Sequence, residues 1–242
     1  MKVVVLDDEE RIGSAVGEQF CALAREKANA VFGLATGMTP IPTYQYMIAQ
    51  YKAKNVSFSS VRTFNLDEYC DLPRAHKNSF YQFMLQELFA HIDLPPAHID
   101  FLDGNTTDEF AESERYRTAI EACGGIDLQL LGIGRNGHIG FNEPAENFTV
   151  ESYKTALTPS TIAANSIYFD DVPMPKYAMT MGVGAILRAK KIILIATGSS
   201  KADAVKTMLE GEVSPRCPAT ALRDHADATV YLDPPAAARL CH

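Results

Sequence analysis

The chain has no tryptophan, only five cysteines and no long apolar run. The cysteines are odd in number and widely spaced, without a C-x-x-C pair, which argues against both a disulfide framework and a cysteine-based zinc site. Free thiols suit a reducing compartment. No stretch approaches the roughly 20 apolar residues that a membrane span requires, and the apolar run at residues 3–6 is too short for a signal peptide. We therefore expect a cytoplasmic protein without a membrane partner.

Positive charge is also scarce, because 22 lysines and arginines stand against 30 acidic residues and give a net charge of −8. Nucleic acids and anionic membranes require clustered positive charge, so we expect neither as a partner. An anionic small molecule is compatible with this composition, since a pocket can be locally basic on an acidic protein. The H-E-x-x-H metal motif, the G-x-x-x-x-G-K-[ST] nucleotide motif and the G-x-S-x-G nucleophile motif are missing. We predict no metal and no cofactor.

Short β-branched runs alternate with longer amphipathic segments along the 242 residues. We expect strands at residues 3–6, 30–34, 61–65, 99–102, 126–131, 191–196 and 229–232. Helices are expected up to about residue 27 and over residues 40–54, 79–91, 107–122 and 200–210. This alternation predicts a single α/β domain over residues 1–242, with an open, mostly parallel, Rossmann-like sheet and helices on both faces. The stretch from residue 135 to about 160 lacks periodicity, which predicts a functional loop or a lid, the latter placed within residues 145–180 (the lid segment).

In an open α/β sheet, ligands bind beyond the carboxyl ends of the strands, so the residues after each strand are the candidates for a site. The first such segment is Thr36–Pro40. Thr39 suits a helix N-cap, Pro40 suits the first helical position, and Gly37 permits a tight turn beside a ligand. Its amides and the helix dipole could form a phosphate cradle from Thr36, Gly37, Met38 and Thr39. Taken alone, an ordinary βα turn explains the segment more simply.

Two adjacent carboxylates, Asp67 and Glu68, follow the third predicted strand. Such a pair can provide a general base beside a supporting acid, because mutual repulsion and partial burial raise one pKa toward the working pH. The alternative is a helix-capping aspartate beside a solvated glutamate. The apolar flank of Phe64, Leu66 and Tyr69 favours a semi-buried pair.

The loop Leu131–Pro144 contains a formal G-x-G-x-x-G. A dinucleotide site requires a helix to begin within that motif, and Gly137, Gly140 and Pro144 prevent one here. We therefore reject a Rossmann cofactor site.

The same loop carries Asn136, His138 and Glu143 among its glycines. Histidine exchanges a proton near neutral pH, and a carboxylate partner can fix its tautomer. Glycines around a histidine indicate tight backbone geometry or close approach of a ligand. We therefore predict a proton-transfer centre in preference to a merely structural histidine.

The fourth segment, Thr197–Ala202, places Lys201 in the first turn of a helix capped by Ser199 or Ser200. A cation there opposes the helix dipole, and a bound anion would offset that cost. A lysine that extends into water explains the position equally well.

Five segments in order along nearly the whole chain resemble the glucosamine-6-phosphate deaminase family: residues 34–40, 64–69, 131–144, 164–169 and 198–201. The strings FNLDEY and LGIGRNGHIGFNEP carry the resemblance most specifically. Related sugar-phosphate lactonases share the fold and the G-x-G-x-x-G-H loop but typically continue along the lines of A-S-L-F-P. Glu143 therefore separates the two activities.

The resemblance implies a role for each candidate residue. Asp67 is the expected enolisation base, and His138 is the expected ring-opening acid and base, oriented by Glu143 and Asn136. The remaining residues are expected to bind the substrate and its phosphate: Thr36, Gly37, Met38, Thr39, Lys201, Glu68 and Gly137. The implied substrate is an amino-sugar phosphate, and the implied product is a ketose phosphate with ammonia.

The chain departs from the family pattern at two places. Ile167 stands where the family usually carries a phosphate-binding arginine, which implies weaker phosphate binding or a changed substrate. Secondly, the residues at 148–158 keep only Lys154 as a basic side chain, unlike the allosterically regulated members. We expect no activation by an amino-sugar phosphate effector.

Three alternatives stay open beside glucosamine 6-phosphate deamination. The same reaction on galactosamine 6-phosphate is compatible with Ile167. A 6-phosphogluconolactonase-like hydrolase would leave Asp67 and Glu143 without an obvious task. A non-catalytic sugar-phosphate sensor would not need Asp67 or His138. A monomer and a small homo-oligomer fit the sequence equally well.

Overall fold

In the computed structural model, which describes residues 1–241, seven parallel strands form one sheet in the order β1-β10-β9-β6-β2-β3-β5. Each corresponds to a strand expected from the sequence, with ends displaced by at most two residues. Their bounds are β1 Lys2–Val5, β2 Val31–Leu34, β3 Arg62–Asn65, β5 Ile99–Asp100, β6 Leu128–Leu131, β9 Ile192–Ala196 and β10 Ala228–Leu232. From β2 the chain continues outward through β3 and β5, and it then returns to β6 on the other side of β2. The strand order therefore reverses between β2 and β6, where open α/β sheets bind ligands.

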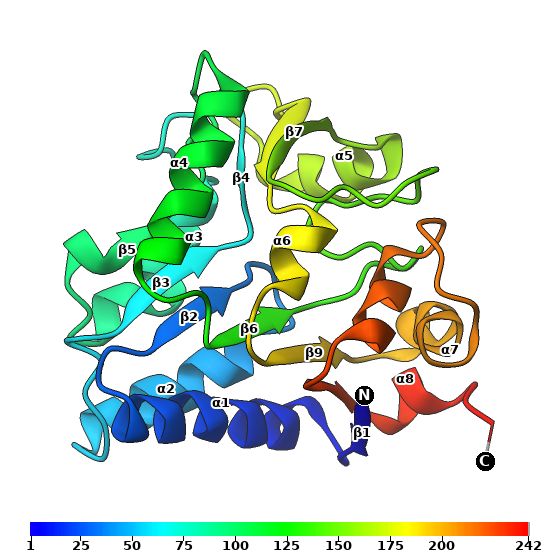
Figure 1. Ribbon diagram of the computed structural model, residues 1–242, viewed down its shortest axis with the longest axis horizontal. Coiled ribbons are helices and arrows are strands. Elements are labelled where there is room, and N and C mark those ends of the chain that lie inside the picture. Colours follow the sequence, from blue (N-terminus) through cyan, green and yellow to red (C-terminus); the bar gives the residue numbers. More distant parts are fainter. Residues whose placement is uncertain (242) are drawn as a thin grey trace.

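Helices cover both faces of this sheet, with α1 and α2 on one side and α4 and α6 on the other (Figure 1). The α-helices are α1 Glu9–Glu26, α2 Ile41–Lys52, α3 Phe80–Glu87, α4 Glu109–Ala122, α5 Pro159–Asn165, α6 Val183–Leu187, α7 Ala202–Glu210 and α8 Pro234–Ala237. Short 3-10 turns complete the chain: η1 Phe89–His91, η2 Pro96–His98, η3 Ser166–Tyr168, η4 Ser199–Lys201 and η5 Pro218–Asp224.

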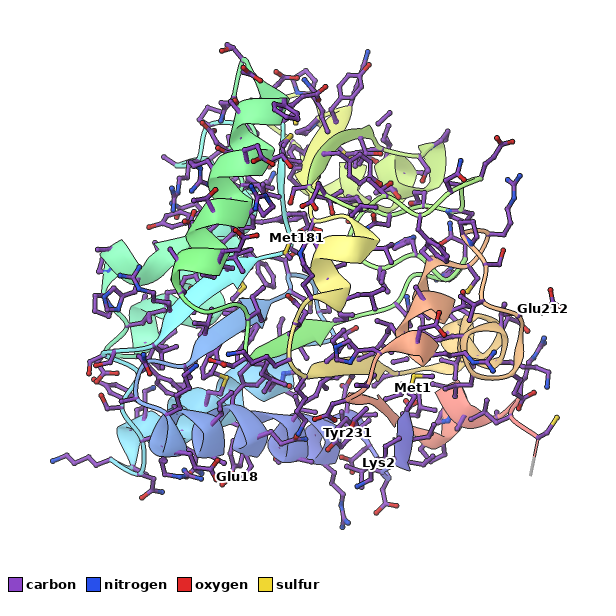
Figure 2. The ribbon with its side chains drawn as sticks, viewed as in Figure 1. Met1, Lys2, Glu18, Met181, Glu212 and Tyr231 are labelled. Carbon is purple, nitrogen blue, oxygen red and sulfur yellow. The ribbon has the colours of Figure 1, made fainter. Side chains whose placement is uncertain are left out.

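Each face of the sheet has its own apolar core. On the α1 side, Phe20 and Phe32 meet edge to face with centroids 4.8 Å apart, and Tyr231 packs into the same cluster (Figure 2). On the other side, the ring of Tyr116 is fully buried and its hydroxyl donates to the backbone oxygen of Asn65 at 2.6 Å. Met181, also fully buried, belongs to this second cluster (Figure 2). The near-continuous apolar strands predicted from the sequence are thus explained by burial on both faces.

A second, antiparallel sheet of three short strands was not predicted from the sequence. It consists of β4 Asp67–Tyr69, β8 Tyr177–Thr180 and β7 Tyr153–Ala156, with β8 in the middle. The prediction of an irregular stretch over residues 135–160 is therefore wrong at β7. Half of the residues of β7 are exposed and β4 has only three residues. Neither segment therefore has an apolar run from which a strand could be predicted.

Two predicted helix caps are also wrong. Helix α2 begins at Ile41 with Pro40 as its N-cap, and α7 begins at Ala202 after η4, so neither Thr39 nor the serines at 199 and 200 cap a helix with a side chain. In both places a backbone turn satisfies an amide that a cap would have bound. The amide of Ile41 donates to the oxygen of Met38 at 3.2 Å, and that of Lys201 donates to the oxygen of Gly198 at 3.1 Å.

Among the helices that the structure describes, none combines the length and the hydropathy needed to cross a bilayer.

Candidate active site

A cavity of about 780 Å³ opens at the carboxyl ends of β2 and β6, where the strand order reverses. Its walls come from the loops after both strands, from β4, from α5 and from η4. Seven of the residues predicted from the sequence line it together: Thr36, Gly37, Thr39, Asp67, Asn136, His138 and Lys201. Four others, Met38, Glu68, Gly137 and Glu143, do not line it. The volume lies within the usual range for small-molecule sites.

Asp67 lies where the chain leaves the large sheet and enters the small one. The preceding residue, Leu66, bonds to both sides, because its amide donates to the oxygen of Leu34 at 3.1 Å and its oxygen accepts from the amide of Met181 at 2.8 Å. Asp67 itself pairs with Thr180 of β8. Its side chain is buried, and no hydrogen bond to its carboxyl group is found in the described part of the chain. Burial, reinforced by the charge of Glu68, raises the pKa of Asp67 to about 8.

Gly140 lies beside that carboxyl group and beside Thr180. A Cβ atom at this position would lie 3.6 Å from Oδ2 of Asp67 and 3.0 Å from Oγ1 of Thr180, and the backbone has φ of +55°. A side chain here would therefore strain the loop and crowd the hydroxyl of Thr180, the residue that pairs with Asp67.

Glu68 points away from the cavity. Its carboxylate accepts hydrogen bonds from the amides of Tyr69 at 2.9 Å, Phe80 at 2.8 Å and Tyr81 at 3.0 Å. Two of these amides belong to the first turn of α3, whose unpaired N–H groups favour an anion. Burial raises the pKa of Glu68 although the three amides oppose that shift. Glu68 thus fixes β4 to α3 and holds Asp67 in place.

The ring of His138 is oriented by two partners on its own loop. Its Nδ1 lies 2.8 Å from Oδ1 of Asn136 and 3.3 Å from Oε1 of Glu143, and Nδ2 of Asn136 donates to Oε2 of Glu143 at 2.6 Å. An amide oxygen only accepts hydrogen bonds, so Nδ1 carries the proton. In the neutral ring the lone pair is therefore on Nε2, which has no hydrogen-bond partner among the described residues and is the nitrogen available to a ligand.

Glu143 lies behind the histidine and not in the wall of the cavity. Burial alone would raise its pKa, but hydrogen bonds and the nearby charge of His138, with hydrogen bonds from Asn136 and Thr161, lower it overall. The hydroxyl of Thr161, on α5, donates to Oε1 at 3.3 Å. Glu143 therefore stays ionised and stabilises a protonated His138.

The backbone around His138 is packed closely against its surroundings. A Cβ atom at Gly134 would collide with the imidazole ring, so only glycine leaves room for it. The oxygen of Gly137 accepts from the amide of Ala219 at 2.9 Å, and this places Gly137 beneath the loop against η5. Gly137 thus supports the loop from outside the cavity.

Another part of the cavity wall is suited to an anion. The backbone amides of residues 36–39 donate no hydrogen bond within the part of the chain that the structure describes. Lys201 lines the same cavity, with Nζ donating to the oxygen of Ile133 at 2.7 Å. Burial, with a smaller contribution from Arg135, lowers the pKa of Lys201. The side chain of Met38 is 72% exposed, so this residue contributes its backbone alone.

Two contributors to the site were missed from the sequence. Thr161 approaches Glu143 only because α5 folds back over the loop. An aromatic wall forms from Phe80, Tyr69 and Phe141, with Phe80 and Phe141 stacked at 6.0 Å and 13°. No local sequence signal announces either, since both depend on the packing of segments distant in the chain. Within the described residues, no cluster of three or more His, Cys, Asp or Glu side chains could hold a metal ion.

Comparison with known proteins decides the family. The model of the family described as glucosamine-6-phosphate isomerases/6-phosphogluconolactonase matches residues 7–231. The chain belongs to this isomerase/lactonase family. A relative from Hahella chejuensis, named glucosamine-6-phosphate deaminase, is 46% identical over 241 residues, which cover 99% of this chain and 92% of that protein.

Solved structures of the isomerase/lactonase family show the same fold. A monomeric glucosamine-6-phosphate deaminase superposes with a TM-score of 0.93 and 42% identity, covering 98% of this chain and 99% of the other. A 6-phosphogluconolactonase from Leishmania guyanensis gives a TM-score of 0.73 at 20% identity, with 100% and 99% of the two chains covered. The second likeness shows the fold alone.

Proposed function

We propose that the protein is an enzyme that converts glucosamine 6-phosphate and water into fructose 6-phosphate and ammonia. The observation that carries the proposal is the presence of two separate proton-transfer groups, Asp67 and His138, in one cavity with an anion-binding end. The name and the high coverage of the relatives support the same reaction. A lactone hydrolase would need an activated water at His138 but would leave the buried carboxyl group of Asp67 without a task.

Ring opening is the first step, and His138 is suited to it. With its proton on Nδ1, the neutral ring accepts the proton of the sugar 1-hydroxyl at Nε2 and delivers it to the ring oxygen as the C1–O5 bond breaks. Glu143 and Asn136 stabilise the transient imidazolium and hold the ring in this tautomer.

Isomerisation follows at Asp67. The carboxylate removes the proton from C2 of the open-chain amino aldehyde as the aldehyde oxygen gains a proton, which gives an enol amine. Asp67 then returns its proton to C1 as the amine nitrogen gives up one, which leaves a hydroxymethyl group at C1 and an imine at C2. Water then adds to the imine, ammonia leaves and the ketone remains. A pKa of about 8 suits this task, because a base must both take up and release the proton near neutral pH.

We further propose that the lid segment closes over the sugar. Thr161 and Asn165 of α5 line the cavity, and Thr161 also contacts Glu143. A closed lid would exclude water until the imine has formed.

The protein is proposed to be a cytoplasmic monomer that acts on a small amino-sugar phosphate. All five cysteines are free, which suits a reducing compartment. The solved deaminase that it resembles at 42% identity is described as monomeric.

The test is a parallel assay of ammonia and fructose 6-phosphate from glucosamine 6-phosphate, with galactosamine 6-phosphate as the comparison. Equal amounts of both products from the gluco substrate support the proposal. Ammonia from the galacto epimer alone would retain the mechanism and change the substrate. No ammonia from either sugar would overturn the proposed function.

A further inference from the structure

Two side chains that carry positive charge as lysine or arginine line the cavity, and only one of them was expected to bind phosphate. Besides Lys201, the exposed side chain of Arg135 contributes to the wall. Arg135 lies in the turn between Gly134 and Gly137, which is closed by a hydrogen bond of 3.0 Å between their backbones. The ammonium group of Lys201 is bonded to the oxygen of Ile133, two residues before Arg135. Lys201 is therefore held against the loop to which Arg135 belongs.

Arg135 has no carboxylate partner in the part of the chain that the structure describes. Several other arginines do, as with Arg188 and Glu151 at 2.6 Å and Arg117 and Glu114 at 2.7 Å. The positive charge of Arg135 also contributes to the lowered pKa of Lys201, which shows that the two cations repel each other. Two like charges that line one cavity, neither of them in an ion pair with a carboxylate of the described residues, are unfavourable unless an anion binds between them.

The charge of a phosphate monoester matches this pair. At neutral pH such a group carries about −1.5 to −2. Lys201 alone supplies a single positive charge. Its ammonium group has three N–H donors, and the bond to Ile133 leaves two of them for a ligand. An arginine adds the second charge and a planar fork that binds two phosphate oxygens at once.

Neither Ile167 nor Lys154 of the lid segment supplies a second cation to the cavity. Ile167 is 75% exposed in η3 and does not line the cavity. The ammonium group of Lys154 lies 5.1 Å from the centre of the Tyr177 ring on the small sheet, away from the lining. Among the described residues of the cavity wall, Arg135 is thus the one arginine.

We propose that Arg135 is the second phosphate-binding cation of the site and gives the enzyme its selectivity for 6-phosphorylated sugars although residue 167 is isoleucine. This inference rests on the proposed function for the identity of the sugar, and on the cavity alone for the anion.

The test compares Arg135→Met and Arg135→Lys with Arg62→Met. Arg62 is also exposed, but it lies at the amino end of β3, opposite the edge of the sheet that forms the cavity. Titration calorimetry with inorganic phosphate is expected to show a loss of affinity of roughly 10- to 100-fold for Arg135→Met. Arg135→Lys, which keeps the charge and loses the fork, should show a smaller loss, and Arg62→Met should match the wild type.

Kinetics separates binding from a general disturbance of the loop. Arg135→Met should raise KM for glucosamine 6-phosphate with little change in kcat, and it should leave turnover of unphosphorylated glucosamine unchanged. Equal phosphate affinity in Arg135→Met and Arg62→Met, or a loss confined to kcat, would overturn the inference. If the wild type releases no ammonia while Arg135→Met still loses phosphate affinity, the proposed function fails and the role of Arg135 stands.

Discussion

Thr161 of helix α5 donates a hydrogen bond to Oε1 of Glu143 at 3.3 Å, the same oxygen that lies 3.3 Å from Nδ1 of His138. A residue of the lid segment therefore contacts the carboxylate that orients the proposed ring-opening histidine. Lid position and histidine orientation are linked through one oxygen atom.

Replacing Thr161 with valine removes this bond while keeping the shape of the side chain. The bond helps to lower the pKa of Glu143, so its loss should raise that pKa and move the acid limb of the kcat/KM profile to higher pH. We expect kcat/KM at neutral pH to fall about 3- to 10-fold, in line with one lost hydrogen bond to a charged acceptor. Thr161→Ser keeps the hydroxyl and should behave like the wild type. An unchanged pH profile in Thr161→Val would contradict the coupling.

Asp67→Asn should reduce kcat by about a thousandfold, since an amide cannot take up the C2 proton. Binding of fructose 6-phosphate, measured by calorimetry, should be preserved because the phosphate end of the cavity is untouched. Glu68→Gln is the matched comparison. Its partners are the amides of β4 and α3, so it should lower the thermal midpoint of unfolding and retain most of its activity. Turnover within a few-fold of the wild type in Asp67→Asn would refute the base assignment.

The raised pKa of Asp67 also predicts how stability depends on pH. Between the ordinary pKa of 3.8 and about 8, the folded protein holds a proton at this site that the unfolded chain has released. Stability contributed by that proton is complete below pH 4 and is lost as the pH rises through 8. Asp67→Asn lacks this ionisation. The thermal midpoint of unfolding of the variant minus that of the wild type should therefore increase as the pH rises from 4 to 9. Each kcal/mol gained should appear as about 2–4 °C. A constant difference between the two proteins over this range would exclude the raised pKa.

Lys201→Ala should raise KM for glucosamine 6-phosphate about 10-fold or more and lower kcat far less, because the phosphate is held equally in the ground state and the transition state. Lys206→Ala, on the adjacent helix α7, is the control. Lys206 pairs with Glu210 on the surface and does not line the cavity, so its removal should leave both constants unchanged. A pure loss of kcat in Lys201→Ala would place this lysine in the chemical steps.

The sequence predicted the large sheet because its central strands are buried on both faces and appear as apolar runs. The 5 residues of β9 and of β10 are all buried, and the prediction located both within a residue. The small sheet could not be found in this way. Its strands β4 and β8 pair residues more than 100 positions apart, as with Asp67 and Thr180, and only tertiary contacts define this pairing.

For the candidate site, the sequence predicted which segments meet but not the direction of each side chain. Loops that follow parallel strands must meet at one edge of the sheet, so the meeting of Asp67, His138 and Lys201 in one cavity follows from topology. The direction of individual side chains does not follow from topology. Glu68 faces α3 because period-two alternation in β4 turns it away from Asp67, and Met38 faces solvent.

At Leu66 the chain passes from the large sheet to the small sheet, and the residues of the site are divided between these two sheets. The proposed phosphate-binding groups, Lys201 and the amides of residues 36–39, follow strands of the large sheet, whereas Asp67 belongs to the small sheet, whose strands β7 and β8 lie in the lid segment. A sugar phosphate that reaches from one end to the other joins the two sheets through its own carbon chain. Bound substrate then links the two sheets and restricts their motion relative to each other. The relative motion of the sheets should therefore be smallest while substrate is bound and the reaction takes place.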